Sequence, residues 1–307
     1  MRARRGRFVL IGVDWGTTSL RAYLIGDDGW PVDRVEGRQG LLNVTDGDFE
    51  GVLQRAVSGW LADAPAGTPI LLSGMVGSRQ GWVEAPYVSV PATAAALAAN
   101  CAEIATSSMG RVRIVPGVLL DDAASGRADV MRGEETEIMG ALAALGLSDG
   151  TFVLPGTHSK WVTVSAGVIT DFSTYMTGEI FAAMRDHTIL SRMMKSEGDD
   201  AAAYADGVGT GLALSGPGEL LSALFGVRVR GLLGRLSEAS SASFLSGLLI
   251  GAEIASAAAG RAEVVIVAAP GLAERYRSAL ATAGIANRLA PPDTAAQGLA
   301  RIAAQLP

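Results

Sequence analysis

The chain has 307 residues, of which 49% are hydrophobic and 18% are charged. That much apolar material supports a large core and excludes a disordered chain, and the length suggests two domains because one core rarely grows past roughly 250–300 residues. There are 25 Lys and Arg against 31 Asp and Glu, so the net charge is −6, which argues against a nucleic-acid-binding protein. The only basic cluster is short and terminal, and we interpret it as a solvated tail: Arg2, Arg4, Arg5 and Arg7.

The first half of the sequence predicts an alternation of strands and helices. Residues 8–13 form a continuous apolar run that predicts a buried strand and is too short for the apolar part of a signal peptide. After the loop 14–19, strands are expected at 20–25 and 30–36, joined by a turn at Asp27-Asp28-Gly29. The later pattern predicts helices at 48–62, 92–107 and 134–145, and strands at 70–73 and 112–115.

The helix expected at 92–107 contains Cys101, the only cysteine of the sequence. A single cysteine can form no intramolecular disulfide, which indicates a reducing cytoplasm, and it excludes a zinc site of Cys/His spacing. No histidine lies near Cys101 in the sequence, so a small core residue is favoured over a nucleophile.

The opening pattern then recurs about 140 residues later. A strand at 151–154, a Gly-Thr loop, a strand at 160–165, a tight turn and a strand at 168–172 repeat the arrangement of residues 8–36. The segments 16–19 and 156–159 occupy equivalent places in the two copies. We therefore expect two duplicated α/β domains, residues 1–149 and 150–307, facing a shared cleft.

The second half continues mainly as helices, expected at 178–192, 218–233, 243–259, 272–283 and 295–305, with a buried strand at 263–268. The apolar run 242–259 contains Glu253 and several serines, which favours a buried helix over a membrane span. Residues 207–211 (GVGTG) resemble a glycine fingerprint but follow no expected strand. The sequence lacks P-loop, protein-kinase and serine-hydrolase motifs.

The loop 14–19 is the most informative segment for chemistry. Asp14 follows the first strand directly, and a carboxylate at a strand end can hold Mg²⁺ through water. Gly16 allows the backbone to approach a phosphate, while Thr17 and Thr18 can donate hydroxyl and N–H groups to phosphate oxygens. A merely polar turn is the alternative, and the position of Asp14 favours a phosphate site.

The loop 155–160 is a second candidate phosphate cradle, built on Gly156 and Thr157. Lys160 can supply a positive charge to a transferring phosphoryl group, although it can also be simply exposed. His158 can donate to a phosphate or hydrogen-bond the turn, and the sequence favours neither.

Glu134 and Glu135 open the helix that precedes the second loop. The helix dipole stabilises a carboxylate at this end, which suits a group that orients the proton of an attacking hydroxyl. On local sequence alone, the simpler interpretation is a set of acids on a solvated helix face.

The glycine-rich segment 72–91 has the composition of a binding loop. Arg79 could clamp a carboxylate, with Gln80 beside it, and Tyr87 could pack against a sugar or cover the core, as could Trp82. Asn43, in an earlier loop, could contact a hydroxyl.

Taken together, these loops make the chain resemble the sugar kinase/heat-shock chaperone/actin superfamily. Four segments narrow the resemblance to the 2-dehydro-3-deoxygalactonokinase family: residues 71–92, 129–142, 154–162 and 244–254. The resemblance implies two RNase H-like, actin-like ATPase domains around an interdomain ATP cleft. It also implies a cytoplasmic phosphotransferase that uses ATP and Mg²⁺ to phosphorylate the 6-hydroxyl of 2-dehydro-3-deoxygalactonate in galactonate catabolism.

Residue roles follow from the same resemblance. Asp14 would hold Mg²⁺ through water, the two Gly-Thr loops would line the phosphates, and Gly271 would contact adenine. The base would be Glu134, with Glu135 as the alternative. The expected partners are a small sugar acid and, at most, a second copy of the chain in a homodimer, but neither nucleic acid nor a membrane.

Two alternatives stay open on sequence grounds. One is another sugar, sugar-acid or acetate-type kinase of the same superfamily, and the other is a non-metabolic actin-like ATPase such as a chaperone or filament protein. The short chain and the segment 72–91 favour a small-molecule kinase.

Overall fold

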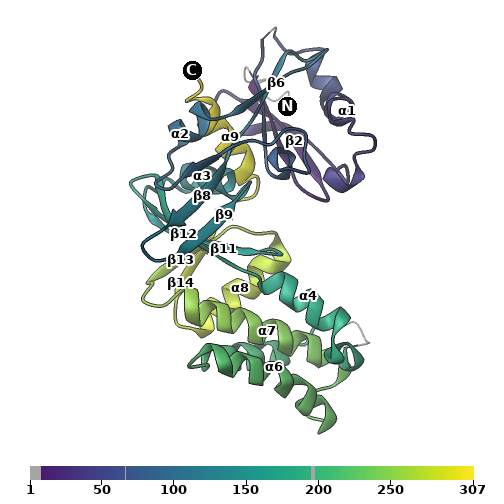
Figure 1. The fold of residues 1–307 in the computed structure, drawn as a ribbon, viewed down its shortest axis with the longest axis vertical. Coiled ribbons are helices and arrows are strands. Elements are labelled where there is room, and N and C mark those ends of the chain that lie inside the picture. The colour runs from purple at the N-terminus through teal and green to yellow at the C-terminus, as the bar shows by residue number, and fades with distance from the viewer. Residues whose placement is uncertain (1–7, 66, 195–197) are drawn as a thin grey trace, which may run out of the picture. The chain divides into compact units, whose positions relative to one another are not determined.

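The computed structural model describes residues 8–65, 67–194 and 198–307, so the basic cluster at Arg2, Arg4, Arg5 and Arg7 lies outside the described residues. By its internal contacts the chain divides into two compact units (Figure 1). Unit 1 runs to Asp149 and adds Thr163–Phe172 and Ala290–Pro307, and unit 2 comprises Gly150–Val162 and Ser173–Leu289. The domain boundaries expected from the sequence stay a prediction.

Unit 1 is built on a six-stranded sheet with the order β3-β2-β1-β4-β7-β6. The central strand β1 is the apolar run predicted to be a buried strand, and it pairs antiparallel with β2 and parallel with β4. Asp14 of β1 is in register with Ser73 of the parallel strand β4, so the two residues lie at the same edge of the sheet. The strands are β1 (Phe8–Trp15), β2 (Leu20–Gly26), β3 (Pro31–Gly37), β4 (Ile70–Ser73), β6 (Ala102–Ala105) and β7 (Arg111–Ile114).

Helices and a small second sheet complete unit 1. The sheet has the order β5-β8-β9 and carries part of the glycine-rich segment. Its strands are β5 (Tyr87–Ser89), β8 (Gly117–Asp122) and β9 (Arg127–Met131). The helices are α1 (Phe49–Leu61), α2 (Ala94–Ala99), α3 (Glu134–Leu145) and α9 (Thr294–Ala303), with short 3-10 turns at η1 (Leu41–Asn43) and η2 (Met75–Gly77).

The long helix expected at 92–107 is wrong. The structure has the short helix α2, which ends where the Asn100 side chain donates to Ala96 O at 2.9 Å, followed by strand β6. Pairing of β6 with β7 overrides the helix propensity of the alanines. Cys101 lies between the two elements and is half-buried, so it is neither in a helix nor a core residue as expected. Burial raises the pKa of its thiol to about 12, which disfavours the nucleophilic thiolate.

The C-terminal helix α9 packs against α3 inside unit 1, as the yellow helix of Figure 1 shows. The two backbones approach so closely that side chains are excluded at the crossing. A Cβ added at Gly140 would clash with Thr294 O, and one added at Gly298 would clash with Thr136 O. Glycine is therefore required at both positions by space.

A five-stranded sheet has the order β12-β11-β10-β13-β14, with β10 parallel to β13 and β13 parallel to β14. Strands β11 and β12 form the predicted hairpin, with its turn at Ala166-Gly167. The strands are β10 (Gly150–Leu154), β11 (Ser159–Ser165), β12 (Val168–Tyr175), β13 (Glu263–Ile266) and β14 (Ala286–Leu289).

The described helices of unit 2 pack around α7. The helix expected at 178–192 is shorter, because Thr188 adopts an extended conformation, and its side chain then caps η3 (Ile189–Met193). By length and composition α7 could cross a membrane, yet most of it is buried within unit 2, as predicted. The helices are α4 (Thr177–His187), α5 (Ala201–Leu212), α6 (Pro217–Leu232), α7 (Glu238–Ala257) and α8 (Pro270–Thr282).

Helix α5 was not expected from the sequence, and it contains the GVGTG segment. Its glycines serve packing: a Cβ at Gly207 would clash with Phe244 O of α7, and one at Gly211 would clash with Leu248 O. Gly247 and Gly251 of α7 are equally tight against α5. The segment is thus a helix-crossing site, which agrees with the rejection of a dinucleotide fingerprint.

Candidate active site

The first Gly-Thr loop is held in place by backbone hydrogen bonds. Gly16 N donates to Ser19 O at 2.9 Å, and Leu41 N and Leu42 N donate to the carbonyls of Gly16 and Thr17, both at 3.1 Å. A Cβ at Gly16 would meet nothing closer than Ser19 O at 3.7 Å, so the space beside Gly16 is open. The side chains of Thr17 and Thr18 are exposed. The loop is therefore a fixed turn with free donors, as a phosphate site requires.

Asp14 stands at the end of β1 with its side chain only 16% exposed. One carboxylate oxygen pairs with Arg21 Nη2 at 3.2 Å. Burial raises the pKa of Asp14, and the charge of Arg21 opposes that shift. The other oxygen, Oδ1, lies beside Gly74, whose φ of +91° suits glycine and where an added Cβ would stand 3.3 Å from Oδ1.

These surroundings fit a magnesium ion that is held mostly by water and phosphate. Among the residues that the structure describes, no group of three or more His, Cys, Asp or Glu side chains could hold a metal ion. Mg²⁺ in phosphoryl-transfer sites needs only one or two carboxylates besides substrate phosphates. Asp14, with one oxygen beside a glycine, meets that requirement.

The acids at the start of α3 differ sharply in exposure. Glu135 is fully buried, and its oxygens accept hydrogen bonds from Gly133 N at 2.7 Å and Thr136 Oγ1 at 3.0 Å. Burial, with a smaller contribution from Glu134, raises the pKa of Glu135 to about 8. Glu134 is half-buried and accepts from Arg132 N at 2.9 Å, so its carboxylate is the one of this pair that a substrate could reach.

Glu137, about one turn further along α3, also interacts electrostatically with Asp14, the residue before the first loop. Burial and then the charge of Asp14 raise the pKa of Glu137 to about 8. The start of α3 and the end of β4 also touch, because a Cβ at Gly133 would stand 3.2 Å from Gly74 Cα. Asp14 and the acids of α3 therefore belong to one charged centre of unit 1.

The structure does not bring the four predicted substrate residues together by direct contact. Arg79 is 81% exposed and pairs with Glu84 at 3.1 Å, and Gln80 next to it is exposed. The Asn43 side chain donates to Arg38 O at 2.5 Å. Tyr87 is 41% exposed and its ring lies over the guanidinium of Arg132, which local sequence did not single out.

Trp82, which the sequence left between a sugar contact and a core cover, takes part in core packing. Its ring stacks on Phe49 with centroids 6.2 Å apart, and Phe49 meets Trp15 edge-on at 5.7 Å. Trp15 in turn donates to Gln39 O at 2.8 Å and so anchors the strand that ends in the first loop.

The second Gly-Thr loop packs against the first turn of α4 in unit 2. Glu179 N donates to Thr157 O at 3.0 Å, the Glu179 carboxylate meets His158 Nε2 at 2.6 Å, and a Cβ at Gly178 would clash with Gly156 O. His158 thus bonds within the protein. Lys160 is buried, and its Nζ donates to Thr174 Oγ1 at 2.7 Å.

A buried carboxylate that sequence reasoning missed stands behind this loop. Glu253 of α7 is 3% exposed and accepts hydrogen bonds from four side chains on three elements. The donors are Ser159 Oγ (2.7 Å), Trp161 Nε1 (2.6 Å), Tyr276 OH (2.9 Å) and Thr177 Oγ1. Burial raises the pKa of Glu253, and these donors oppose the shift. The sequence signal that could have identified Glu253 is its position as the one acidic residue of the apolar run 242–259.

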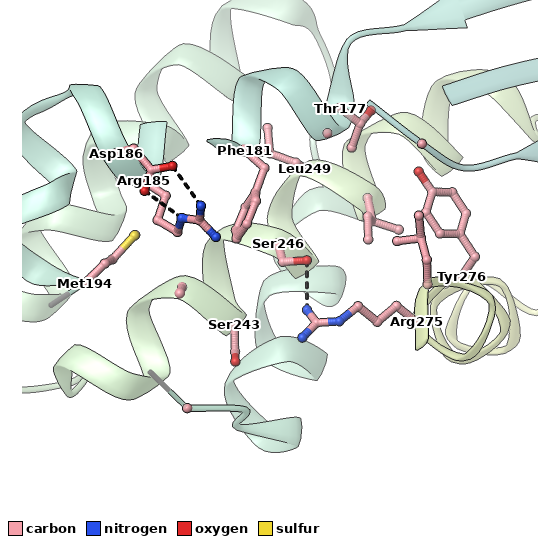
Figure 2. A pocket seen from close by; sticks show the side chains of 16 residues that line it. Thr177, Phe181, Arg185, Asp186, Met194, Ser243, Ser246, Leu249, Arg275 and Tyr276 are labelled. Carbon is pink, nitrogen blue, oxygen red and sulfur yellow. Dashed lines mark hydrogen bonds and ion pairs between the residues drawn. The ribbon is translucent and has the colours of Figure 1, made fainter. Parts of the chain in front are cut away.

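A pocket of about 670 Å³ in unit 2 begins at the second loop. Gly156, Thr177 and Gly178 form one part of its lining, and Tyr276 extends it along α8. Figure 2 shows Arg275 reaching Ser246, at 2.9 Å, across the pocket from the Arg185–Asp186 pair. Gly271 does not line the pocket, but its neighbour Leu272 does. The lining mixes apolar side chains such as Leu249 and Ile250 with polar and charged groups, a combination that can hold a polar small molecule such as a nucleotide.

Known proteins match the chain almost end to end. The family model described as 2-keto-3-deoxy-galactonokinase matches residues 14–302. A probable 2-dehydro-3-deoxygalactonokinase of Rhizobium meliloti is 38% identical over 290 residues, 92% of each chain, and the 2-dehydro-3-deoxygalactonokinase of Escherichia coli is 36% identical over 295 residues, 94% of each chain. The crystal structure of a putative 2-dehydro-3-deoxygalactonokinase from Sinorhizobium meliloti superposes with a TM-score of 0.87 at 37% identity, covering 96% of this chain and 98% of that one.

The similarity in sequence and in structure extends over both Gly-Thr loops and both units. It confirms the expected family, the α/β fold and the assignment to ATP-using kinases. The chain belongs to the 2-keto-3-deoxy-galactonokinase family.

Proposed function

We propose that this protein transfers the γ-phosphoryl group of ATP to the 6-hydroxyl of 2-dehydro-3-deoxy-D-galactonate, giving the 6-phosphate and ADP. The observation that carries the proposal is the family match over residues 14–302, which includes every candidate catalytic residue. The geometry around Asp14 and Glu134 supports it. We also propose that the protein acts in the cytoplasm, in the catabolism of galactonate.

The nucleotide is proposed to bind in unit 2 through the 670 Å³ pocket and the second loop. Adenosine would lie between the aliphatic side chains of α7 and α8, near Arg275. Gly156 and Thr157 would face the phosphates, because a Cβ at Gly156 would meet nothing closer than His158 O at 3.8 Å. The hydrogen-bonded position of Lys160 gives it a supporting role in our proposal rather than direct contact.

The phosphates and Mg²⁺ are proposed to engage unit 1 through Asp14 and the first loop. When bound, Mg²⁺ neutralises charge on the transferring phosphoryl group. Asp14 would orient the waters of the ion through Oδ1, while Arg21 fixes the other oxygen. Gly16, Thr17 and Thr18 would donate N–H and hydroxyl groups to phosphate oxygens.

Glu134 is proposed as the group that accepts the proton of the 6-hydroxyl. It stands at the N-terminus of α3, where the dipole favours its ionised form, and Arg132 N holds its carboxylate at 2.9 Å. Glu135, the earlier alternative, has no exposed surface and both of its oxygens are engaged. A base in this position would orient the nucleophile, which is the main task in phosphoryl transfer.

ADP release with Mg-ATP and a panel of sugar acids and neutral aldoses tests the proposal. We expect turnover with 2-dehydro-3-deoxygalactonate, and a product phosphorylated at carbon 6 by ³¹P–¹H correlation NMR. Turnover confined to another acid would replace the substrate, and no substrate-dependent release with any compound would refute the kinase function. Sedimentation with ATP separates out the filament alternative, since only a filament pellets.

A further inference from the structure

Arg132 is a buried cation without a matching anion. It lies between β9 and α3, is 8% exposed, and its guanidinium donates one hydrogen bond, from Nη2 to Ala85 O at 2.8 Å. Its Nε and Nη1 are buried and have no hydrogen-bond partner. No carboxylate in the described part of the chain forms an ion pair with it at 4.0 Å or less.

Such an arrangement is unfavourable in the protein alone. Taking a charged group out of water costs several kcal/mol unless an opposite charge and hydrogen bonds compensate it. Other arginines of unit 1 that are far more exposed, such as Arg55 and Arg79, have carboxylate partners. An unpaired buried guanidinium therefore indicates an anion that is supplied from outside the chain.

The immediate surroundings offer further unused donors. A Cβ at Gly77 would stand 3.1 Å from Arg132 Nη1, and the adjacent Ser78 has a buried hydroxyl without a partner. Ser73, next to Gly74 and thus beside Gly133, has another. The Nε–Nη1 edge of a guanidinium matches the two oxygens of a carboxylate, and the unpartnered hydroxyls of these neighbouring segments are further unused donors.

We propose that Arg132 binds the carboxylate of the sugar acid and makes the enzyme select acids over neutral sugars. The inference rests on the proposed function and adds the residue that recognises its substrate. Arg132 N also holds Glu134, so the acid-binding side chain and the base belong to one short segment. Binding at one end of an extended six-carbon acid would then place its other end for reaction.

The Tyr87 ring covers the Arg132 guanidinium, and its displacement would give a ligand access to that group. Its ring centroid lies 4.4 Å from Arg132 Cζ, yet the side chain is 41% exposed. We expect the exposed ring of Tyr87, at the start of β5, to turn aside when the acid binds. The role that the sequence suggested for Arg79 passes to Arg132, because Arg79 is exposed and already paired.

The test compares the acid with its carboxamide, which has the same shape without the charge. For Arg132→Gln we expect the ratio of kcat/KM for acid over amide to fall about 10- to 150-fold, the value of hydrogen bonds to a charged group. KM for ATP should stay within about twofold, and Arg132→Lys should recover part of the ratio. Arg55→Gln is the matched control at an exposed arginine.

Binding without turnover separates this inference from the proposed function. Calorimetry and thermal shift with the acid and the amide, in the absence of ATP, should show acid preference in the wild type and its loss in Arg132→Gln. These measurements remain decisive even if no phosphorylation occurs, an outcome that would refute only the proposed reaction. An unchanged acid preference in folded Arg132→Gln, or its loss in Arg79→Gln instead, would overturn the assignment.

Discussion

The two Gly-Thr loops share a sequence pattern but differ in how the protein supports them. Backbone donors hold both loops, from Leu41 and Leu42 to the first and from Glu179 to the second. The second loop has side-chain support as well, from the His158–Glu179 pair and the buried Glu253. In each case one glycine of a neighbouring segment permits the close contact, Gly40 for the first loop and Gly178 for the second. The repeat therefore preserves the loop and its approach distance, but not the interactions behind it.

The buried acids near the two loops differ in the same way. In unit 1 burial raises the pKa of Asp14, Glu135 and Glu137, so that part of the site resists ionisation. In unit 2 burial also raises the pKa of Glu253, but there four side-chain donors oppose the shift. We infer that the acids of unit 1 lower the stability of the fold and serve the reaction, whereas Glu253 stabilises the fold and the shape of the second loop.

The largest expected effect tests the chemical role of the first centre. Asp14→Asn removes the charge that would orient the waters of Mg²⁺, and we expect kcat to fall by about 10³-fold or more. The fold should persist, because a neutral side chain is easier to bury. Steady-state kinetics and a thermal melt check both points; near-normal turnover would remove Asp14 from the metal site.

The pair Glu134→Gln and Glu135→Gln distinguishes the two acids of α3. Loss of a general base costs about 10²- to 10⁴-fold in rate, so we expect that loss for Glu134→Gln. Glu135→Gln should retain turnover within about tenfold, because its side chain is buried. Rapid-quench measurement of the chemical step gives the comparison. The reverse order would assign the base to Glu135.

Glu253 tests the support of the second loop. Glu253→Ala leaves four buried donors without their acceptor, and we expect the free energy of unfolding to fall by about 3–5 kcal/mol. Glu253→Gln keeps the shape and should lose less. In both variants KM for ATP should rise more than KM for the sugar acid, because the loop lines the pocket that we propose for the nucleotide. Denaturant titration and kinetics on each substrate check this; equal changes in both KM values would argue against it.

Stability should depend on pH through Glu135. Burial raises its pKa from 4.5, the value of an exposed glutamate, to about 8 in the folded protein, so the unfolded chain loses this proton at lower pH than the folded one does. The free energy of unfolding should therefore decrease as pH rises from about 4.5 to 8, by at most about 1.4 kcal/mol per pH unit for this group. Glu135→Gln should flatten the slope in part, since Glu137 titrates in the same window. Urea unfolding from pH 5 to 9 measures the slope, and an unchanged slope would contradict the assignment.

The smallest effect is expected at His158. Its hydrogen bond with Glu179 joins two side chains that are both 49% exposed, and such surface contacts contribute about 0–1 kcal/mol. His158→Gln should therefore change stability by less than about 1 kcal/mol and leave KM for ATP within a few-fold. Isothermal calorimetry with ATP checks the second value, and a change of a hundredfold would show that His158 contacts the phosphates.

Local signals predicted the parts of the fold where pattern and packing agree. The strands around both loops and the helices α1 and α3 follow directly from apolar runs and spacing. Helix α5 was missed because its glycines oppose helix formation locally and are needed only by contact with α7. Strand β6 was missed for the opposite reason, because its alanines favour a helix that sheet pairing overrides.

The candidate site was predictable where chemistry follows directly from a loop. Asp14 and the Gly-Thr segments stand at strand ends, and the sequence shows that. The contrast between Glu134 and Glu135 depends on which side chain is buried, and the unpaired state of Arg132 depends on segments far apart in the chain. No spacing rule contains that information.

The glycine crossing between α5 and α7 has a consequence for how variants of this enzyme would be interpreted. Glu253 lies on α7 just beyond Gly247 and Gly251, so a larger side chain at either glycine would push apart two helices and shift the carboxylate with one of them. A substitution that touches no ligand would then resemble a nucleotide-binding defect in an assay. Substitutions on the exposed side of α6 should be the simplest to interpret, because an apolar-to-polar change there does not move α7 or Glu253.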